Sequence, residues 1–118
     1  PTVPLPFVVG AGGRIEENRP VAEAWRRLLP LERLKADAAP YRRLCTIGLE
    51  AGRQDEIPNV TAGAAAFDRE LSRAGIVHTY TEFTGGHVDR TRERFESVVL
   101  PFFARVFDES ARNAVCGP

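Results

Sequence analysis

The stretch that decides the fold runs from residue 44 to residue 87 and reads LCTIGLEAGRQDEIPNVTAGAAAFDRELSRAGIVHTYTEFTGGH. Its first part, residues 44–49, is short and mostly apolar, the pattern of a strand covered on both faces. The β-branched and aromatic residues of 76–83 predict a second strand. Between them a helix is predicted by apolar residues at helical spacing, and it ends at Gly75, where a C-cap belongs. These residues are Val60, Ala64, Phe67, Leu71 and Ala74.

The order strand, helix, strand predicts a parallel pair joined by a crossover helix, because strands that alternate with helices form parallel sheets. Both strands then end at the same edge of the sheet, where open α/β sheets bind their ligands. Neighbouring strands lie about 4.8 Å apart. Asp55 follows the first strand and His87 follows the second. We therefore expect this carboxylate and this imidazole to lie within hydrogen-bonding reach.

An acid beside a histidine is the arrangement that general-base catalysis needs. A carboxylate that accepts the Nδ1 proton fixes the imidazole tautomer, and the other ring nitrogen can then take a proton from a serine hydroxyl. Gly85 and Gly86 precede His87 and allow a tight turn that pushes the ring into a cleft, and Gly52 gives the loop of Asp55 similar freedom.

Each of these residues also has a simpler interpretation. A lone histidine in a loop is usually a solvated side chain, and an aspartate such as Asp55 is often a turn residue. Glu50, Glu56 and Asp89 are rival acids, and Glu50 is the main competitor because it is close to the strand end. His78 lies within the second strand and is interpreted as a cross-strand or surface residue.

The flanking sequence predicts short elements. Residues 7–9 predict a strand, 10–13 a turn, and 21–29 and 31–38 two short helices separated by Pro30, with Pro40 closing that segment. Residues 91–107 predict a last helix, kinked at Pro101, and the tail after Asp108 is expected to fray. We divide the chain into a Pro/Gly-rich, cap-like helical segment (1–40), a βαβα half-domain (41–108) and a flexible tail (109–118).

Composition excludes several classes of protein. The chain has 118 residues, with 16 basic and 16 acidic side chains, so no basic face is implied and nucleic acid is not an expected partner. No apolar run approaches the roughly 20 residues of a membrane span. Two cysteines are too few for a disulfide framework; Cys45 is expected as a small buried apolar residue and Cys116 as an exposed thiol, with a bridge between them as the alternative. Localisation stays open between cytoplasm and secretion.

The sequence resembles the esterases of the α/β-hydrolase superfamily that include esterase D-like and feruloyl-esterase-like proteins. The resemblance covers residues 40–107 and rests on three stretches in order, 47–55 with Gly52-Arg53-Gln54-Asp55, 71–76 with Gly75-Ile76, and 80–87 with Gly85-Gly86-His87. In that family the aspartate of the first stretch is the triad acid and the histidine of the third is the general base. The resemblance implies these catalytic roles for Asp55 and His87, and it implies a fold that is the C-terminal portion of a three-layer α/β-hydrolase sandwich with a parallel sheet and crossover helices.

The nucleophile motif Gly-x-Ser-x-Gly of that family is absent, because Ser72, Ser97 and Ser110 are not flanked by the required glycines. The chain also begins with Pro1 and contains no methionine, which we interpret as an excerpt or a processed part of a longer protein. The resemblance implies the C-terminal part of a serine carboxylesterase that acts on a small-molecule ester and needs no metal or organic cofactor. We expect a homo-oligomer or a complementing N-terminal half, because half a sheet leaves a strand edge unpaired.

Two other classes of function remain open. One is a non-catalytic, oligomeric interaction domain derived from an α/β hydrolase. The other is a metal site that uses His87 and Asp89 with His78 or Glu82, although no ligand spacing supports it.

Overall fold

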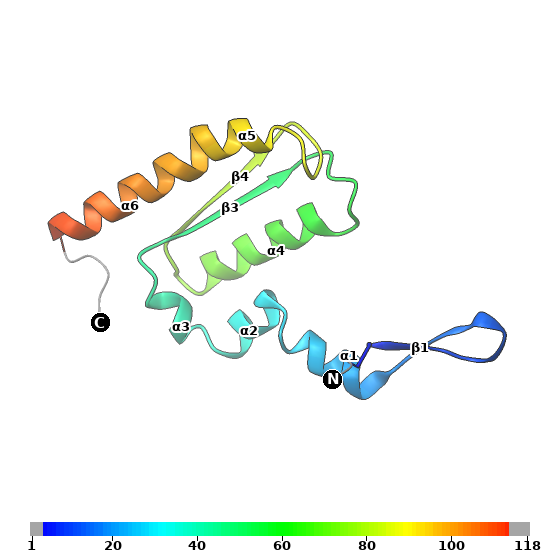
Figure 1. The fold of residues 1–118 in the computed structure, drawn as a ribbon. Helices are drawn as coiled ribbons and strands as arrows, with labels where there is room; N and C mark the ends of the chain where they lie inside the picture. Colours follow the sequence, from blue (N-terminus) through cyan, green and yellow to red (C-terminus); the bar gives the residue numbers. More distant parts are fainter. Residues whose placement is uncertain (1–3, 114–118) are drawn as a thin grey trace.

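The computed structural model describes residues 4–113, which form a mixed α/β fold (Figure 1). An N-terminal arm, which runs from β1 to α3, precedes a βαβα unit, which runs from β3 to α6. The βαβα unit carries the candidate site. The elements are, in order, β1 (Phe7–Val9), η1 (Ala11–Gly13), β2 (Ile15–Glu17), α1 (Arg19–Arg26), α2 (Pro30–Ala36), α3 (Ala39–Arg42), β3 (Ile47–Gly52), α4 (Val60–Arg73), β4 (His78–Phe83), α5 (Thr91–Arg94), η2 (Phe95–Val99) and α6 (Leu100–Asn113).

The strands β3 and β4 are parallel neighbours joined by the crossover helix α4, which confirms the predicted connection. Their register pairs Ile47 with His78 at one end and Gly52 with Phe83 at the other. Both strands therefore end together, and the loops that follow them leave the same edge of the sheet (Figure 1). We call this edge the carboxyl edge.

The core lies between this sheet and α4. Side chains alternate along a strand, and Ile47 and Leu49 of β3 pack against the buried side chains of Leu34, Leu71 and Ile76. Leu71 comes from α4 and is fully buried, whereas Leu34 comes from α2. The apolar stripe that predicts α4 is thus its inner face, and a helix of the N-terminal arm closes the core beside it.

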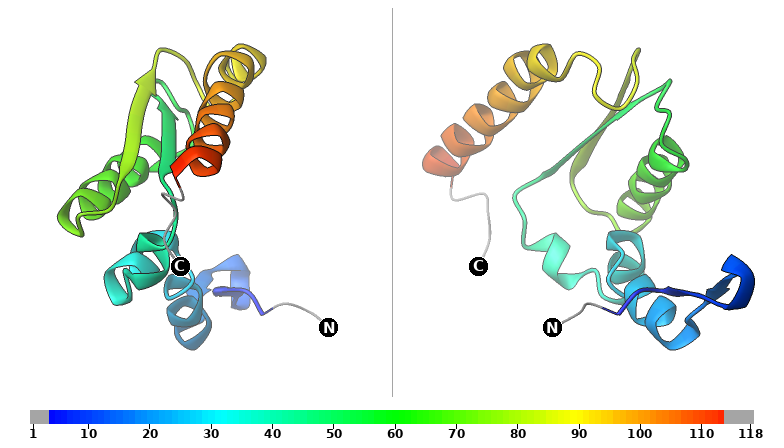
Figure 2. Two further views of the ribbon diagram at one scale, coloured as in Figure 1. Left: turned by 90° about the vertical axis from the view of Figure 1, so that its left-hand side faces the viewer. Right: turned by 45° about the vertical axis from the view of Figure 1, so that its right-hand side comes forward.

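The opposite face of the sheet is covered by α5, η2 and α6, which follow one another as a single helical rod (Figure 2). Gly48 lets the rod approach, because a Cβ atom there would lie only 3.2 Å from the Phe102 ring. The rod has one widened turn, in which the N–H of Leu100 donates to the carbonyl of Phe95. Pro101 follows directly and its ring crowds the preceding turn. A π turn thus directly precedes the proline at which the sequence predicts a kink.

Several predicted boundaries are wrong. The strand predicted over 44–49 is displaced to Ile47–Gly52, because the N–H of Leu44 still donates to the carbonyl of Tyr41 at the end of α3. Pro40 does not close the preceding segment; it stands in the first turn of α3, where proline suits a helix start. The last helix continues to Asn113, beyond the predicted end at residue 107.

The hairpin at the start of the N-terminal arm lies away from the core, whereas α2 packs against it (Figure 1). β1 and the unpredicted strand β2 form an antiparallel hairpin around the predicted turn of residues 10–13. The described chain has a radius of gyration of 18.2 Å, against about 13 to 14 Å for a compact domain of this length. The chain is therefore much less compact than a closed single domain.

Each of the two sheets in residues 4–113 has two strands, so the structure has a mixed α/β fold but not the wide sheet of a complete hydrolase sandwich. Cys45, which the sequence predicts as buried, is half-buried and disulfide-bonded. The other cysteine, Cys116, lies outside the described residues. Among residues 4–113 no helix is both long enough and apolar enough to cross a bilayer.

Candidate active site

The loops that follow β3 and β4 meet at the carboxyl edge. We call residues 53–59 the acid loop and residues 84–90 the histidine loop. Gly52, the last residue of β3, makes their approach possible, because a Cβ atom there would collide with the carbonyl oxygen of Gly85 and lie 2.8 Å from that of Gly86. This glycine is thus explained by close approach and not by the conformational freedom that the sequence suggests.

Asp55 and His87 come together at this edge, as their positions in the sequence predict. Oδ2 of Asp55 lies 2.9 Å from Nδ1 of His87, and Oδ1 accepts the backbone N–H of Ile57 at 2.9 Å. The Asp55 side chain is 3% exposed and the His87 side chain 44%. The acid is therefore enclosed beneath a ring that faces solvent.

The charge on Asp55 determines which ring nitrogen carries the proton. The hydrogen bond from His87 holds the pKa of Asp55 below its ordinary value, and the N–H of Ile57 acts in the same direction, while burial opposes both. An ionised carboxylate can only accept hydrogen bonds, so Nδ1 of His87 is the donor. In the neutral ring Nε2 then carries the lone pair, and within residues 4–113 no hydrogen bond engages it. Such a ring can accept a proton from a group that approaches from solvent.

Glu50, the main rival acid, is engaged elsewhere. Its carboxylate pairs with Arg94 of α5, whose guanidinium also lies over the Phe83 ring, 5.2 Å from the centroid. Both side chains of the ion pair are largely buried. The pair fastens α5 to β3 on the face of the sheet opposite α4, so Glu50 is a structural residue here and not the partner of His87.

The other two rival acids contact the main chain of the histidine loop. Oε2 of Glu56 accepts the backbone N–H of His87 at 3.0 Å, and Oδ2 of Asp89 accepts the N–H of Gly86 at 2.8 Å. Of the four acids considered, Asp55 is the one that hydrogen-bonds the imidazole.

His78 belongs to a separate polar cluster between β4 and α4. Its Nδ1 lies 2.7 Å from the carbonyl oxygen of Ile76 and its Nε2 3.0 Å from Oδ1 of Asp68. The Ile76 carbonyl and the Asp68 carboxylate raise the pKa of His78, while burial lowers it. Beside it, burial and the hydrogen bond to Glu82 raise the pKa of Tyr80 to about 12. His78 therefore fastens the strand to the helix and takes no part in the candidate site.

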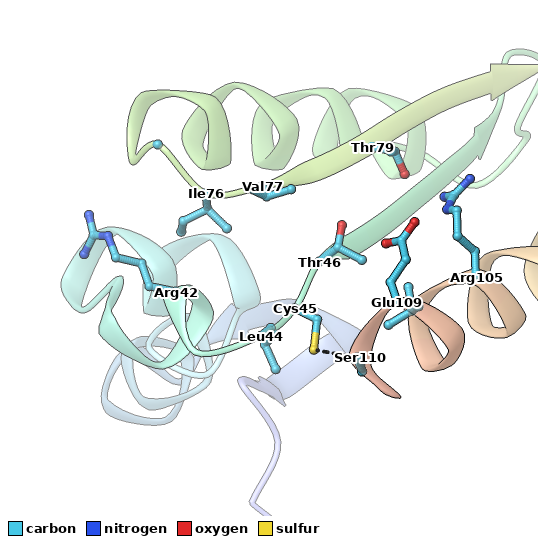
Figure 3. Close-up of a pocket in the computed structure, with 12 residues that line it drawn as sticks. Arg42, Leu44, Cys45, Thr46, Ile76, Val77, Thr79, Arg105, Glu109 and Ser110 are labelled. Carbon is cyan, nitrogen blue, oxygen red and sulfur yellow. Dashed lines mark hydrogen bonds between the residues drawn. The ribbon is translucent and has the colours of Figure 1, made fainter. Parts of the chain in front are cut away.

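The three serines lie apart from His87. Ser72 and Ser97 are exposed on α4 and η2, and Ser110 of α6 lies 3.7 Å from Sγ of Cys45. Ser110 lines a pocket of about 630 Å³ together with residues at the amino-terminal ends of the two strands (Figure 3). That pocket is therefore at the end of the sheet opposite the carboxyl edge, and no serine of residues 4–113 is hydrogen-bonded to His87.

Sequence reasoning missed Gln54, and it considered Glu56 only as a rival acid; both flank Asp55 and bind the main chain of the histidine loop. No residue pattern distinguishes such acceptors from ordinary polar loop residues. At the start of α4, Asn59 makes no side-chain cap, and Thr61 donates to the carbonyl of Gly52 at 2.7 Å.

Within the described part of the chain no group of three or more His, Cys, Asp or Glu side chains is arranged to hold a metal ion. Comparison with models of known protein families finds no match. No curated protein sequence is significantly similar to the chain. The function is therefore argued from the site itself and from the sequence motifs that led to it.

Proposed function

We propose that the chain is the C-terminal part of a serine carboxylesterase of the α/β-hydrolase class, in which His87 is the general base and Asp55 is the acid that orients it. The observation that carries the proposal is the 2.9 Å contact between Asp55 and Nδ1 of His87, a side chain that is 44% exposed and whose Nε2 makes no hydrogen bond within residues 4–113. The order of acid and histidine along the chain agrees with that of the hydrolases.

In the proposed reaction a serine Oγ attacks the ester carbonyl carbon while Nε2 of His87 takes the hydroxyl proton. The tetrahedral intermediate then collapses, the bond to the alkoxy oxygen breaks, and the same nitrogen returns the proton to the departing alcohol. In the second half a water molecule attacks the acyl-serine carbonyl carbon and gives a proton to Nε2. The bond from that carbon to the serine Oγ then breaks, and Nε2 returns the proton to Oγ as the carboxylic acid leaves. Asp55 stabilises the imidazolium in both halves and keeps the ring in the orientation that both need.

We propose that the serine and the oxyanion donors come from another polypeptide segment, in the same protein or in a partner chain. The open edge of the sheet formed by β3 and β4 supports this proposal, since an unpaired strand edge is a ready template for pairing. The extended shape of the described chain is consistent with it.

The test compares hydrolysis of p-nitrophenyl acetate by the isolated chain and by the natural protein purified from its source. We expect no turnover by the isolated chain. In the natural protein, His87→Ala should lower kcat/KM by about 10⁶-fold and Asp55→Asn by about 10⁴-fold. A fluorophosphonate probe should label one serine, which lies outside this chain. Turnover that is insensitive to His87→Ala would contradict the proposal.

A second candidate is a non-catalytic interaction domain. It is favoured by an apolar stripe on α6, where Leu100, Phe103 and Phe107 recur at helical spacing and are each about half or more exposed. Light scattering of the natural protein, combined with the ester assay, decides between the two. A stable oligomer of the natural protein that hydrolyses no ester would favour the interaction domain.

A further inference from the structure

Three consecutive residues of the acid loop hold the histidine loop. Gln54 contacts Gly85 twice, because its backbone N–H donates to the Gly85 carbonyl at 3.1 Å and its Oε1 accepts the Gly85 N–H at 2.6 Å. Asp55 accepts from the His87 ring, and Glu56 accepts the His87 backbone N–H at 3.0 Å. The main chain is therefore fixed at residues 85 and 87, on both sides of Gly86.

The two glycines of the histidine loop leave room for these acceptors. A Cβ atom on Gly86 would lie 2.7 Å from Oε2 of Glu56 and 3.3 Å from Oδ2 of Asp89. Gly85 has a φ of 153°, in the region that favours glycine. A larger residue at position 86 would displace the two carboxylates that hold the main chain ahead of His87.

The imidazole needs this support because few side chains enclose it. The His87 side chain is 44% exposed, and within residues 4–113 its ring makes one hydrogen bond, from Nδ1 to Asp55. A catalytic group has to be held within about 0.5 Å of its productive position. The backbone position of His87 must therefore be set by contacts other than the one with Asp55.

We propose that Gln54 and Glu56 are positioning residues for His87, which act through the main chain of residues 85–87 and determine how the imidazole meets Asp55. Their catalytic importance rests on the proposed esterase function, whereas their effect on His87 can be measured without any substrate. Neither side chain touches the reacting atoms.

The test measures hydrogen exchange of backbone amides and the Nδ1 proton signal of His87 by NMR on the full chain. Glu56→Ala should speed exchange of the His87 amide by about 10-fold, the effect of losing one hydrogen bond, and should weaken the Nδ1 proton signal. Glu56→Gln should restore both, because an amide oxygen also accepts. Glu96→Ala removes an exposed carboxylate of α5–η2 and serves as the matched control, with no expected change at His87.

A second pair of variants keeps the proposal testable if Glu56→Ala unfolds the chain. Gln54→Ala should speed exchange of the Gly85 amide by a similar factor, and Gln54→Glu should restore its protection. The proposal is overturned if the alanine variants leave both readouts unchanged, or if Glu56→Gln and Gln54→Glu fail to restore them. A protein that shows these effects but hydrolyses no ester would refute the esterase function and leave the positioning role intact.

Discussion

The closest approach of the two loops provides the sharpest structural prediction, the effect of Gly52→Ala. The new Cβ atom would lie 2.8 Å from the Gly86 carbonyl oxygen, whereas ordinary contact begins at 3.4 Å, and its overlap with the Gly85 carbonyl oxygen is larger. The histidine loop must therefore withdraw by roughly 0.6 Å or more. If this shift is transmitted to the contact between Asp55 and His87, now 2.9 Å, that contact reaches the limit of a hydrogen bond.

Overpacking of this kind costs about 1–3 kcal/mol. For a chain of this length we expect a fall in Tm of about 4 to 12 °C, measured by far-UV circular dichroism. The Nδ1 proton signal of His87 should weaken in the same variant. Gly63→Ala is the matched control, because Gly63 lies in α4 and a Cβ atom there would have no neighbouring atom within 4 Å. Alanine at this position should raise the stability of the helix by about 0.5–1 kcal/mol.

The reasoning is refuted if Gly52→Ala unfolds within about 1 °C of the wild type and keeps the Nδ1 proton signal. It is also refuted if Gly63→Ala causes the same loss, because the effect would then follow from removing a glycine and not from the contact between the loops.

Three further predictions concern the core and the cluster between β4 and α4. Leu71→Ala should cost about 2–5 kcal/mol of unfolding free energy by urea titration, whereas Leu28→Ala, at a side chain 68% exposed, should cost well under 1 kcal/mol. A backbone carbonyl and a carboxylate raise the pKa of His78. The stability that the protonated ring gives the fold is therefore complete below the ordinary imidazole pKa and is lost as the pH rises through the raised pKa. The Tm difference between wild type and His78→Gln should accordingly be larger at about pH 5.5 than at about pH 8.5. Tyr80 should ionise near pH 12. Phenolate absorbance can follow this ionisation in the variant Tyr41→Phe, in which Tyr80 is the remaining tyrosine. Ionisation near pH 10 would contradict the burial of Tyr80.

The sequence contained enough information to predict the βαβ unit and the meeting of Asp55 with His87. The apolar residues of α4 recur at helical spacing because one face of the helix is buried, and Leu71 lies fully buried on that face. The parallel connection follows from the order of the elements, and it alone brings the two loops to one edge. These features are local or topological, so one sequence suffices to predict them.

The remainder depends on contacts between distant segments. The start of β3 is set by its pairing with β4 and by the turn that ends α3, so residues 44–46 resemble a strand without belonging to one. The role of Glu50 is set by Arg94, which lies 44 residues further along the chain. The role of Glu56 is set by a backbone N–H, which every residue except proline carries. No pattern in the sequence marks such partners.

The most direct test of the central claim is the tautomer of His87, read from the ¹⁵N resonances of its ring at about pH 8 in the wild type and in Asp55→Ala. His78, the other histidine of the chain, is an internal reference. The account predicts that His87 of the wild type carries its proton on Nδ1, and that Asp55→Ala shifts it toward the Nε2 form without changing His78. A wild-type ring protonated on Nε2, or one that does not respond to Asp55→Ala, would contradict the claim that Asp55 and His87 form a catalytic pair.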